Sequence, residues 1–400
     1  MQKFSGKDYL KIDIASNFGL DRALWDERLE WFDKNQHHLL DLLPQAKEPA
    51  LYYAGVLAWA EVTGNKPSGY PISLDATSSG LQLLACLTGD RSAAELCNVV
   101  FTGKREDAYT RLYEAMLEVV GESAKIDRAG TKQAIMTAFY NSVAVPKQIF
   151  GEGKLLQIFF ETLATRCPAA WELNEAYLDI WNPEALRHSW VLPDNFHVHV
   201  KVMDQVKETV HFLNEPFDVF KKVNQPTEEG RSLGANTTHS LDGMIVREMI
   251  RRCSYNPKKV AKVTDVLNAE AMHEHPIKTE DDEMVQILWD HYGKSGYLSA
   301  RILDHITADN VWLVDPIVVL RLIDSLPKKP FDLICVHDCF RCLPNYGDDL
   351  RWQYTLQLHL IAKSNMLNFI LSQLLGHETN IPKLDPTMAD DILHAEYALS

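Results

Sequence analysis

The chain has 400 residues, 46% of them apolar, which is enough to bury the cores of two or three domains. A formal net charge of −15 excludes a protein whose whole surface binds nucleic acid, so any such contact needs a local basic groove or a more basic partner. No stretch resembles a membrane helix or a signal peptide, and 7 scattered cysteines do not indicate a disulfide framework. We therefore expect a cytoplasmic protein, in the host cytoplasm if it is viral, with no membrane partner.

The first elements are predicted to be helices that lead into a short strand. Apolar residues recur three and four positions apart over residues 24–43, and residues 53–64 read as a second helix that ends at a Gly-Asn-Lys-Pro break. The strand that follows ends at Asp75, and two amphipathic helices are expected between residues 80 and 121.

The remaining elements are also mainly helical. Residues 188–203 alternate apolar and polar side chains around a Pro-Asp-Asn turn, which predicts a hairpin. The helices are expected over residues 128–141, 155–181 and 350–375, and over an acidic stretch at 255–329 that has the pattern of a self-contained insertion.

Two aspartates stand at matching places, although they are far apart in the chain. Asp75 ends the run SLD and Asp338 ends the run LICVHD. Phosphoryl transfer to a growing strand uses two divalent ions about 3.5–4 Å apart, and carboxylates are the ligands that Mg²⁺ prefers. Either residue alone would be an ordinary aspartate at a strand end. Together with the helix between them, they predict a nucleotide-polymerising site.

That helix carries cations and an aromatic residue on one face. Arg128, Lys132, Met136 and Tyr140 are four residues apart, so they form a stripe that rotates slowly around the helix. The cations suit a triphosphate, and the aromatic ring suits a sugar and base. A solvated charged face is the common alternative, but the apolar segment AIMTAFY indicates a partly buried helix.

Two features near Asp338 have simpler explanations than a metal site. Cys335, Cys339 and Cys342 include a CxxC pair, but structural zinc needs four ligands and no second pair stands nearby. His337 on a strand would face away from Asp338, so we expect it to give structural support.

The blocks around these residues resemble the single-subunit, bacteriophage-type RNA polymerases, which include the mitochondrial enzyme. The resemblance lies in Asp75 with the following run Ser79–Gln82; in Arg128, Lys132, Met136, Thr137 and Tyr140; and in His337, Asp338 and Phe340, with Cys339 where serine is usual. Further similar blocks at residues 102–116, 189–196 and 236–243, and at the carboxyl terminus, extend it from about residue 53 to residue 400.

The resemblance implies an α/β (α+β) fold, a helix-rich right-hand polymerase palm and fingers without a complete thumb or N-terminal promoter-binding domain. The implied division is an N-terminal helical segment at 1–74, palm with the first catalytic motif at 75–121, fingers with the basic helix and hairpin at 122–254, a helical insertion at 255–329, and palm with the second aspartate and tail at 330–400. The implied activity is DNA-directed RNA synthesis from ribonucleoside triphosphates.

The resemblance also assigns roles to residues. Asp75 and Asp338 would hold two Mg²⁺ ions with the carbonyl of Ala76, while Arg128 and Lys132 would bind the triphosphate. The sugar pocket would involve Tyr140, with His239 near the 2′-hydroxyl and Tyr109 among the substrate-binding residues. Related DNA polymerases place a bulky acidic residue where this chain has Gly80, so room for a 2′-hydroxyl favours ribonucleotides.

Two departures from the family pattern shape the expected partners. The insertion lengthens the gap before Asp338, and only 74 residues precede Asp75, where family members carry several hundred that form the thumb and promoter-binding region. This resembles the large chain of the split, two-chain RNA polymerase of enquatrovirus-like phages. We therefore expect a smaller protein subunit that supplies the missing part, besides a DNA template, an RNA transcript and nucleoside triphosphates. A related DNA polymerase and a non-catalytic scaffold subunit with this fold are the alternatives.

Overall fold

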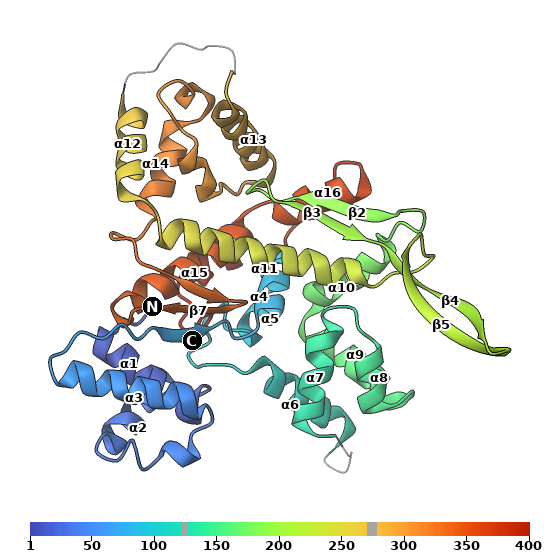
Figure 1. Cartoon of the computed structure of the whole chain (residues 1–400), viewed down its shortest axis with the longest axis horizontal. Helices are drawn as coiled ribbons and strands as arrows, with labels where there is room; N and C mark the ends of the chain where they lie inside the picture. The colour runs from blue at the N-terminus through green and yellow to red at the C-terminus, as the bar shows by residue number, and fades with distance from the viewer. Residues whose placement is uncertain (122–125, 270–277) are drawn as a thin grey trace.

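The computed structural model describes residues 1–121, 126–269 and 278–400. Buried apolar side chains form a main core that runs through the middle of the molecule and two smaller cores. One small core lies within the N-terminal helices. The other lies within residues 260–326. Figure 1 shows these two parts at opposite ends of the molecule, with the main core between them.

A three-stranded antiparallel sheet lies at the centre. Its strand order is β1 (Ile72–Asp75), β7 (Cys339–Cys342) and β6 (Ile334–Val336), so segments from distant parts of the chain pair directly. Alternate residues Ile72, Leu74 and Phe340 are buried. The opposite face carries Ser73, Asp75 and Arg341 together with the exposed apolar residues Ile334 and Val336. The buried face packs toward α4 (Ser79–Thr88) and α15 (Gly347–Lys363).

The N-terminal helices attach to this sheet through one buried carboxylate. Asp13 accepts a hydrogen bond of 2.8 Å from the Ser73 N–H of β1 and one of 2.7 Å from the Tyr70 hydroxyl. The helix expected over residues 24–43 ends at Asn35, and turns follow up to Leu42. The helices here are α1 (Gly6–Ala15), η1 (Ser16–Leu20), α2 (Trp25–Asn35), η2 (Leu43–Gln45) and α3 (Pro49–Thr63).

A helical layer follows the first strand. Between residues 80 and 121 there are three helices rather than two, because Gly89, with φ 71°, ends the first and Asp90 caps the next. The helix expected over 155–181 is broken at Cys167, where Pro168 starts a new helix without needing a backbone donor. The helices are α5 (Arg91–Leu96), α6 (Ala108–Val120), α7 (Arg128–Ala138), α8 (Ala144–Phe150), α9 (Lys154–Arg166) and α10 (Pro168–Asp179).

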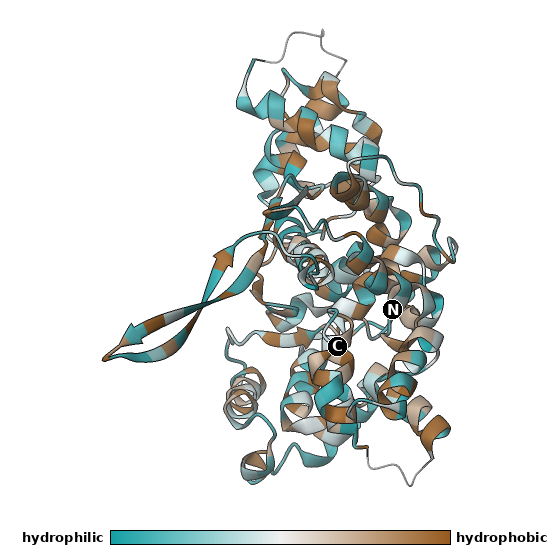
Figure 2. Cartoon of the chain, turned by 90° about the vertical axis from the view of Figure 1, so that its right-hand side faces the viewer, coloured by the Kyte–Doolittle hydropathy of each residue, from teal (hydrophilic) through white to brown (hydrophobic). Residues whose placement is uncertain are grey.

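Two hairpins follow, of which the sequence predicted one. β2 (Arg187–Val191) and β3 (His197–Lys201) pair around the expected turn, where Asn195 has a φ of 56°. The second, β4 (Met203–Phe212) with β5 (Glu215–Asn224), was missed. It extends well beyond the body, and no other layer covers it in either view (Figures 1 and 2).

The long helix α11 (Ser232–Cys253) crosses the molecule and leads into residues 255–329. Their helices pack around their own core: α12 (Pro257–Asn268), α13 (Glu280–Ser295), η3 (Ala300–Asp304), η4 (Val311–Leu313) and α14 (Pro316–Asp324).

The end of the chain also differs from the expected single helix over 350–375. Ser364 and Asn365 break it, and the Asn365 N–H donates to the carbonyl of Ser295. The elements are η5 (Pro344–Tyr346), α15, α16 (Met366–Leu375) and α17 (Met388–Ile392). Among the described residues, no helix has the length and apolar character to span a bilayer.

Candidate active site

The sheet brings Asp75 and Asp338 to the same place. Asp75 pairs with Cys339, the residue after Asp338, and the Ala76 N–H donates to the Asp338 carbonyl over 3.1 Å. His337 and Asp338 form the two-residue turn between β6 and β7, and His337 has a φ of 56°. The expectation that both lie on a strand with opposed side chains is therefore wrong, because the strand ends one residue earlier.

The surroundings of Asp75 disfavour the ionised form of its carboxyl group. Asp75 remains exposed at the mouth of the site, yet desolvation by the surrounding protein and repulsion from Asp338 raise its pKa, despite a hydrogen bond with Cys339. Backbone bonds with Ser400 hold Asp75 in place: the Ser400 N–H donates to the Asp75 carbonyl over 2.9 Å. Two carboxyl groups held together in this way form an oxygen-rich site suited to cations.

The two cations of α7, Arg128 and Lys132, have different surroundings. Arg128 is tied to Asp107 and to Thr110 at the start of α6, and it does not line the hollow beside Asp338. Lys132 does line this hollow, with its Nζ 5.0 Å from the centre of the Tyr109 ring. Desolvation and the nearby Arg22 charge lower the Lys132 pKa. A cation held without a carboxylate partner in the described structure is available for a ligand.

This hollow, of about 260 Å³, collects most of the residues predicted from the sequence. It lies between the sheet end, the start of α4 and the face of α7. Among its lining residues are Ala76, Gly80, Tyr109, Lys132, Met136, Tyr140 and Asp338.

Tyr140 and Gly80 close one wall of the hollow in direct contact. A Cβ atom at Gly80 would lie 2.5 Å from the Tyr140 hydroxyl oxygen, so only glycine allows this tyrosine position. On its other side, the Tyr140 ring lies 4.7 Å from the ring of His239. Desolvation raises the Tyr140 pKa to about 12, which keeps the hydroxyl protonated as a donor. The helix expected over 128–141 ends at Ala138, and Tyr140 in the following turn is brought to His239 on α11, so the predicted residues Tyr140 and His239 lie together.

A second hollow of about 270 Å³ adjoins the first and contains cations that the sequence analysis missed. Arg22, Lys47 and Arg105 line it together with Lys132 and Asp75, while Asp21, Glu106 and Asp107 contribute negative charge. The three missed cations lie in connecting segments, Arg22 and Lys47 between the N-terminal helices and Arg105 before α6, so no periodic pattern connects them with α7. Only the fold places them near Lys132.

Asp242 is a further acidic group that the sequence analysis did not identify. It follows His239 by three residues on α11, and desolvation, followed by repulsion from Asp338, raises its pKa to about 6. The spacing of one helical turn from His239 was the signal that could have found it.

Asp75 and Asp338 are not part of a conventional cluster of metal-binding side chains in the described residues. Within the described ranges, no group of three or more His, Cys, Asp or Glu residues has the geometry of a metal site. The cysteines at 335, 339 and 342 are free thiols. Two carboxylates nevertheless fit Mg²⁺, because this ion keeps water and substrate phosphates in the rest of its shell.

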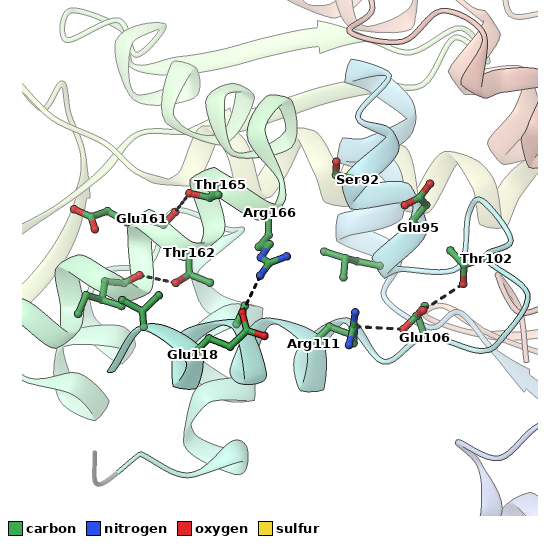
Figure 3. A pocket seen from close by; sticks show the side chains of 14 residues that line it. Ser92, Glu95, Thr102, Glu106, Arg111, Glu118, Glu161, Thr162, Thr165 and Arg166 are labelled. Atoms are coloured by element: carbon green, nitrogen blue, oxygen red, sulfur yellow. Dashed lines mark hydrogen bonds and ion pairs between the residues drawn. The ribbon is translucent and has the colours of Figure 1, made fainter. Parts of the chain in front are cut away.

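A separate polar hollow of about 540 Å³ lies between α5, α6 and α9 (Figure 3). Its arginines are paired within it, Arg166 with Glu118 at 3.3 Å and Arg111 with Glu106 at 3.6 Å. None of the residues predicted for catalysis lines it.

Comparison with known proteins shows what this chain is similar to. Residues 3–149 match the family described as DNA-dependent RNA polymerase. A probable DNA-directed RNA polymerase of Neurospora crassa is 30% identical over 161 residues, covering 34% of this chain and 18% of that protein. The DNA-directed RNA polymerase of Pseudomonas phage phiKMV is 31% identical over 140 residues, covering 31% of this chain and 17% of its own length. A probable DNA-directed RNA polymerase of Gelasinospora aligns with 80% of this chain at 25% identity, over 38% of its own length.

Over these parts the chain is similar to DNA-directed RNA polymerases of a phage and of mitochondria. It spans less than two fifths of the length of these three relatives.

Proposed function

We propose that this chain carries the palm and fingers of a DNA-directed RNA polymerase and adds ribonucleotides to the 3′ end of an RNA. The observation that supports this most strongly is the pairing of β1 with β7, which puts Asp75 next to the turn that carries Asp338. Asp338 lines the first hollow with Lys132 and Tyr140, and Asp75 lines the second hollow, which also contains Lys132. The ions would bind beside the aspartates, the phosphates beside Lys132 and the sugar beside Tyr140.

Two Mg²⁺ ions would be held by Asp75 and Asp338, with the Ala76 carbonyl as a further oxygen ligand. When bound, such ions activate the attacking hydroxyl and neutralise the leaving pyrophosphate. The pKa of Asp75 is raised mainly by desolvation and further by repulsion from Asp338, and a bound cation would offset both effects, which supports this assignment.

Lys132 and the cations Arg22, Lys47 and Arg105 would bind the triphosphate in the hollow next to Asp75. Their positive charge balances phosphate oxygens in a chain that is otherwise strongly acidic. The lowered pKa of Lys132 favours proton donation to the leaving pyrophosphate. Arg128 would act through Asp107 by fixing the start of α6, and so the position of Tyr109.

Tyr140 would position the sugar, with His239 behind it and Gly80 beneath it. The contact between Gly80 and Tyr140 leaves no room for the acidic side chain that related DNA polymerases carry at this place. This argues for ribonucleotides and against the DNA polymerase alternative. The full set of ligands and cations in turn argues against a scaffold that has lost its activity.

The template and transcript would pass the β2–β3 hairpin, and the division into palm, fingers and insertion follows the ranges expected from the sequence. We also propose a smaller polypeptide partner that supplies a thumb. The relatives are longer than the part that this chain matches, which covers 18% and 17% of two of them.

Primer extension on an RNA/DNA scaffold tests this function. The purified chain, with and without its partner, should extend the RNA primer with ribonucleotides in a Mg²⁺-dependent, template-dictated reaction, and should use deoxynucleotides at least tenfold less well. Equal or better use of deoxynucleotides would favour a DNA polymerase. No extension under any condition would favour the scaffold.

A further inference from the structure

The catalytic sheet, which is the central three-stranded sheet with Asp75 at the end of β1, carries a group of polar side chains around Asp75. In the β1–β7 ladder Asp75 lies directly opposite Cys339, and Ser73 lies directly opposite Arg341. Directly opposed residues, and residues two positions apart on one strand, share one face of a sheet. Cys339 is therefore the neighbour of Asp75 on this face, and in the chain it follows Asp338.

The thiol of Cys339 connects Asp75 with Ser73. Its Sγ atom lies 3.0 Å from the Oγ atom of Ser73, and a hydrogen bond joins it to the Asp75 carboxyl group. Because an ionised carboxylate can only accept, the thiol donates its single proton to Asp75, and the Ser73 hydroxyl then donates to the sulfur. Arg341 also interacts with this thiol. The sulfur is thus held by neighbours on both strands.

The hydrogen bond from Cys339 fixes a side chain that packing alone does not hold. Asp75 is the last residue of β1 and the exposed one in that strand, so its carboxyl group has rotational freedom that an ion ligand must lose. The bonds to Ser400 hold only the backbone of Asp75. A carboxylate oxygen that accepts from the thiol leaves the other oxygen free for a cation. Groups that hydrogen-bond a metal ligand in this way set its orientation and the affinity of the site.

The position of Cys339 separates it from the residues that would touch a nucleotide. Among the described residues that line the two hollows beside Lys132, Cys339 does not occur. Its influence on the site therefore passes through Asp75. Cys335 offers a contrast in the same sheet, because it pairs with Phe340 and so lies on the opposite face from Cys339.

We propose that Cys339 is a positioning residue of the metal site, whose thiol donates a hydrogen bond to Asp75 and holds the Asp75 carboxylate in the orientation that binds a divalent cation. Ser73 and Arg341 hold the sulfur in turn. This rests on the proposed function in taking Asp75 as an ion ligand. It requires a hydrogen-bond donor at position 339, so a hydroxyl in place of the thiol preserves the role and an apolar side chain of similar size does not.

The test compares variants of the full chain that differ in the donor at position 339. Cys339→Val removes the donor and keeps a side chain that suits a strand, and Cys339→Ala is a second variant without a donor. Cys339→Ser retains a donor. Cys335→Ala is the matched control, since it removes another half-buried thiol from the other face of the same sheet. Circular dichroism and melting temperature identify any variant that does not fold, and the remaining variant without a donor then carries the comparison.

The first measurement is Mn²⁺ binding to the chain without nucleotide or nucleic acid, followed by the electron paramagnetic resonance signal of the free ion. Cys339→Val and Cys339→Ala should bind Mn²⁺ about tenfold more weakly than the unmodified chain, as is typical when a group that positions a metal ligand is lost. Cys339→Ser and Cys335→Ala should bind like the unmodified chain. In primer extension, the Mg²⁺ concentration for half-maximal rate should rise by the same factor in Cys339→Val, while KM for ribonucleotides and the rate at saturating Mg²⁺ stay unchanged.

Three results would overturn the proposal: equal losses in Cys339→Ser and Cys339→Val, unchanged Mn²⁺ binding in both variants without a donor, or no Mn²⁺ binding by the unmodified chain. The binding measurement needs no RNA synthesis, so it is independent of the proposed function. Weaker Mn²⁺ binding by Cys339→Val in a chain that extends no primer would support the positioning role and count against the polymerase. Normal primer extension with unchanged Mn²⁺ binding in Cys339→Val would do the reverse.

Discussion

At the residue scale, the contact between Gly80 and Tyr140 gives the sharpest expectation. Gly80→Ala places a methyl group 2.5 Å from the Tyr140 hydroxyl oxygen and must displace a ring that also packs on His239. We expect kcat/KM for ribonucleotides to fall about tenfold, roughly 1.4 kcal/mol of transition-state stabilisation, with folding unchanged. Gly243→Ala on α11 is the control, since its methyl group would meet only the flexible end of Arg247 at 3.4 Å. Equal kinetics for both variants would show that Tyr140 does not shape the sugar pocket.

Asp13 gives a residue-scale prediction about pH. Desolvation raises its pKa to about 6, above an ordinary value of 3.8, so the native state binds more protons than the unfolded state between these values. The stability that this group contributes is complete below about pH 4 and is lost as the pH rises through 6. Two pKa units correspond to roughly 3 kcal/mol. Asp13→Asn should reduce the loss of unfolding free energy between pH 4 and 7 by about this amount.

Urea unfolding across this pH range measures the effect. Asp33→Asn is the matched control. Asp33 also lies in the N-terminal helices, but it forms an exposed ion pair with Lys11 instead of being buried. An unaltered pH slope in Asp13→Asn would contradict the assignment of this carboxyl group.

At the element scale, one buried carboxylate joins the β2–β3 turn to α11 and to the insertion. Asp194 is fully buried and bonds Arg247 at 2.6 Å and Arg251 at 2.9 Å, while its carbonyl accepts from Arg301. Removing one member of a buried ion pair leaves the others uncompensated, so Asp194→Ala should cost about 3–5 kcal/mol in unfolding free energy. Asp218→Ala, which breaks an exposed pair with Lys207, should cost less than about 1 kcal/mol. Similar values for the two, measured by denaturant unfolding, would exclude this role.

The β4–β5 hairpin should behave differently from the catalytic sheet. Nearly all its residues are exposed and it extends away from the body, whereas one face of the central sheet is buried in the main core. An isolated two-stranded hairpin is marginally stable. Hydrogen exchange by mass spectrometry should therefore show residues 203–224 exchanging much faster than residues 339–342. Equal protection in the isolated chain would mean that the hairpin is held by contacts that this fold does not contain.

Local patterns were sufficient to predict elements with regular periodicity and failed where side chains or single residues interrupt them. The β2–β3 hairpin and the α7 helix follow directly from alternation and four-residue spacing. The break at Cys167 depends on Pro168. The break at Ser364 depends on the hydrogen bond from the Asn365 N–H to the Ser295 carbonyl, which is visible only in three dimensions. The β4–β5 hairpin was missed because its Leu213-Asn214 turn lacks glycine, although both residues adopt positive φ.

At the scale of the whole molecule, the site is assembled from segments that local reasoning cannot connect. Asp75, Lys132, Tyr140 and Asp338 were identified from sequence because each stands in a short block of characteristic residues. Arg22, Lys47 and Arg105 were not, since only the folded arrangement of the N-terminal helices and of the loop before α6 brings them to the second hollow. Asp242 escaped notice for a different reason, as a single acidic residue in a helix has many ordinary explanations.

The central claim is that Asp75 and Asp338 together hold the ions used in nucleotide addition. Primer extension by Asp338→Asn and Asp75→Asn, each assembled with the same partner and scaffold as the unmodified chain, tests it most directly. We predict that each variant loses at least a thousandfold in rate while binding the scaffold normally, whereas Asp309→Asn at an exposed position in the insertion stays fully active. Retention of more than a tenth of the rate by either active-site variant would contradict the account.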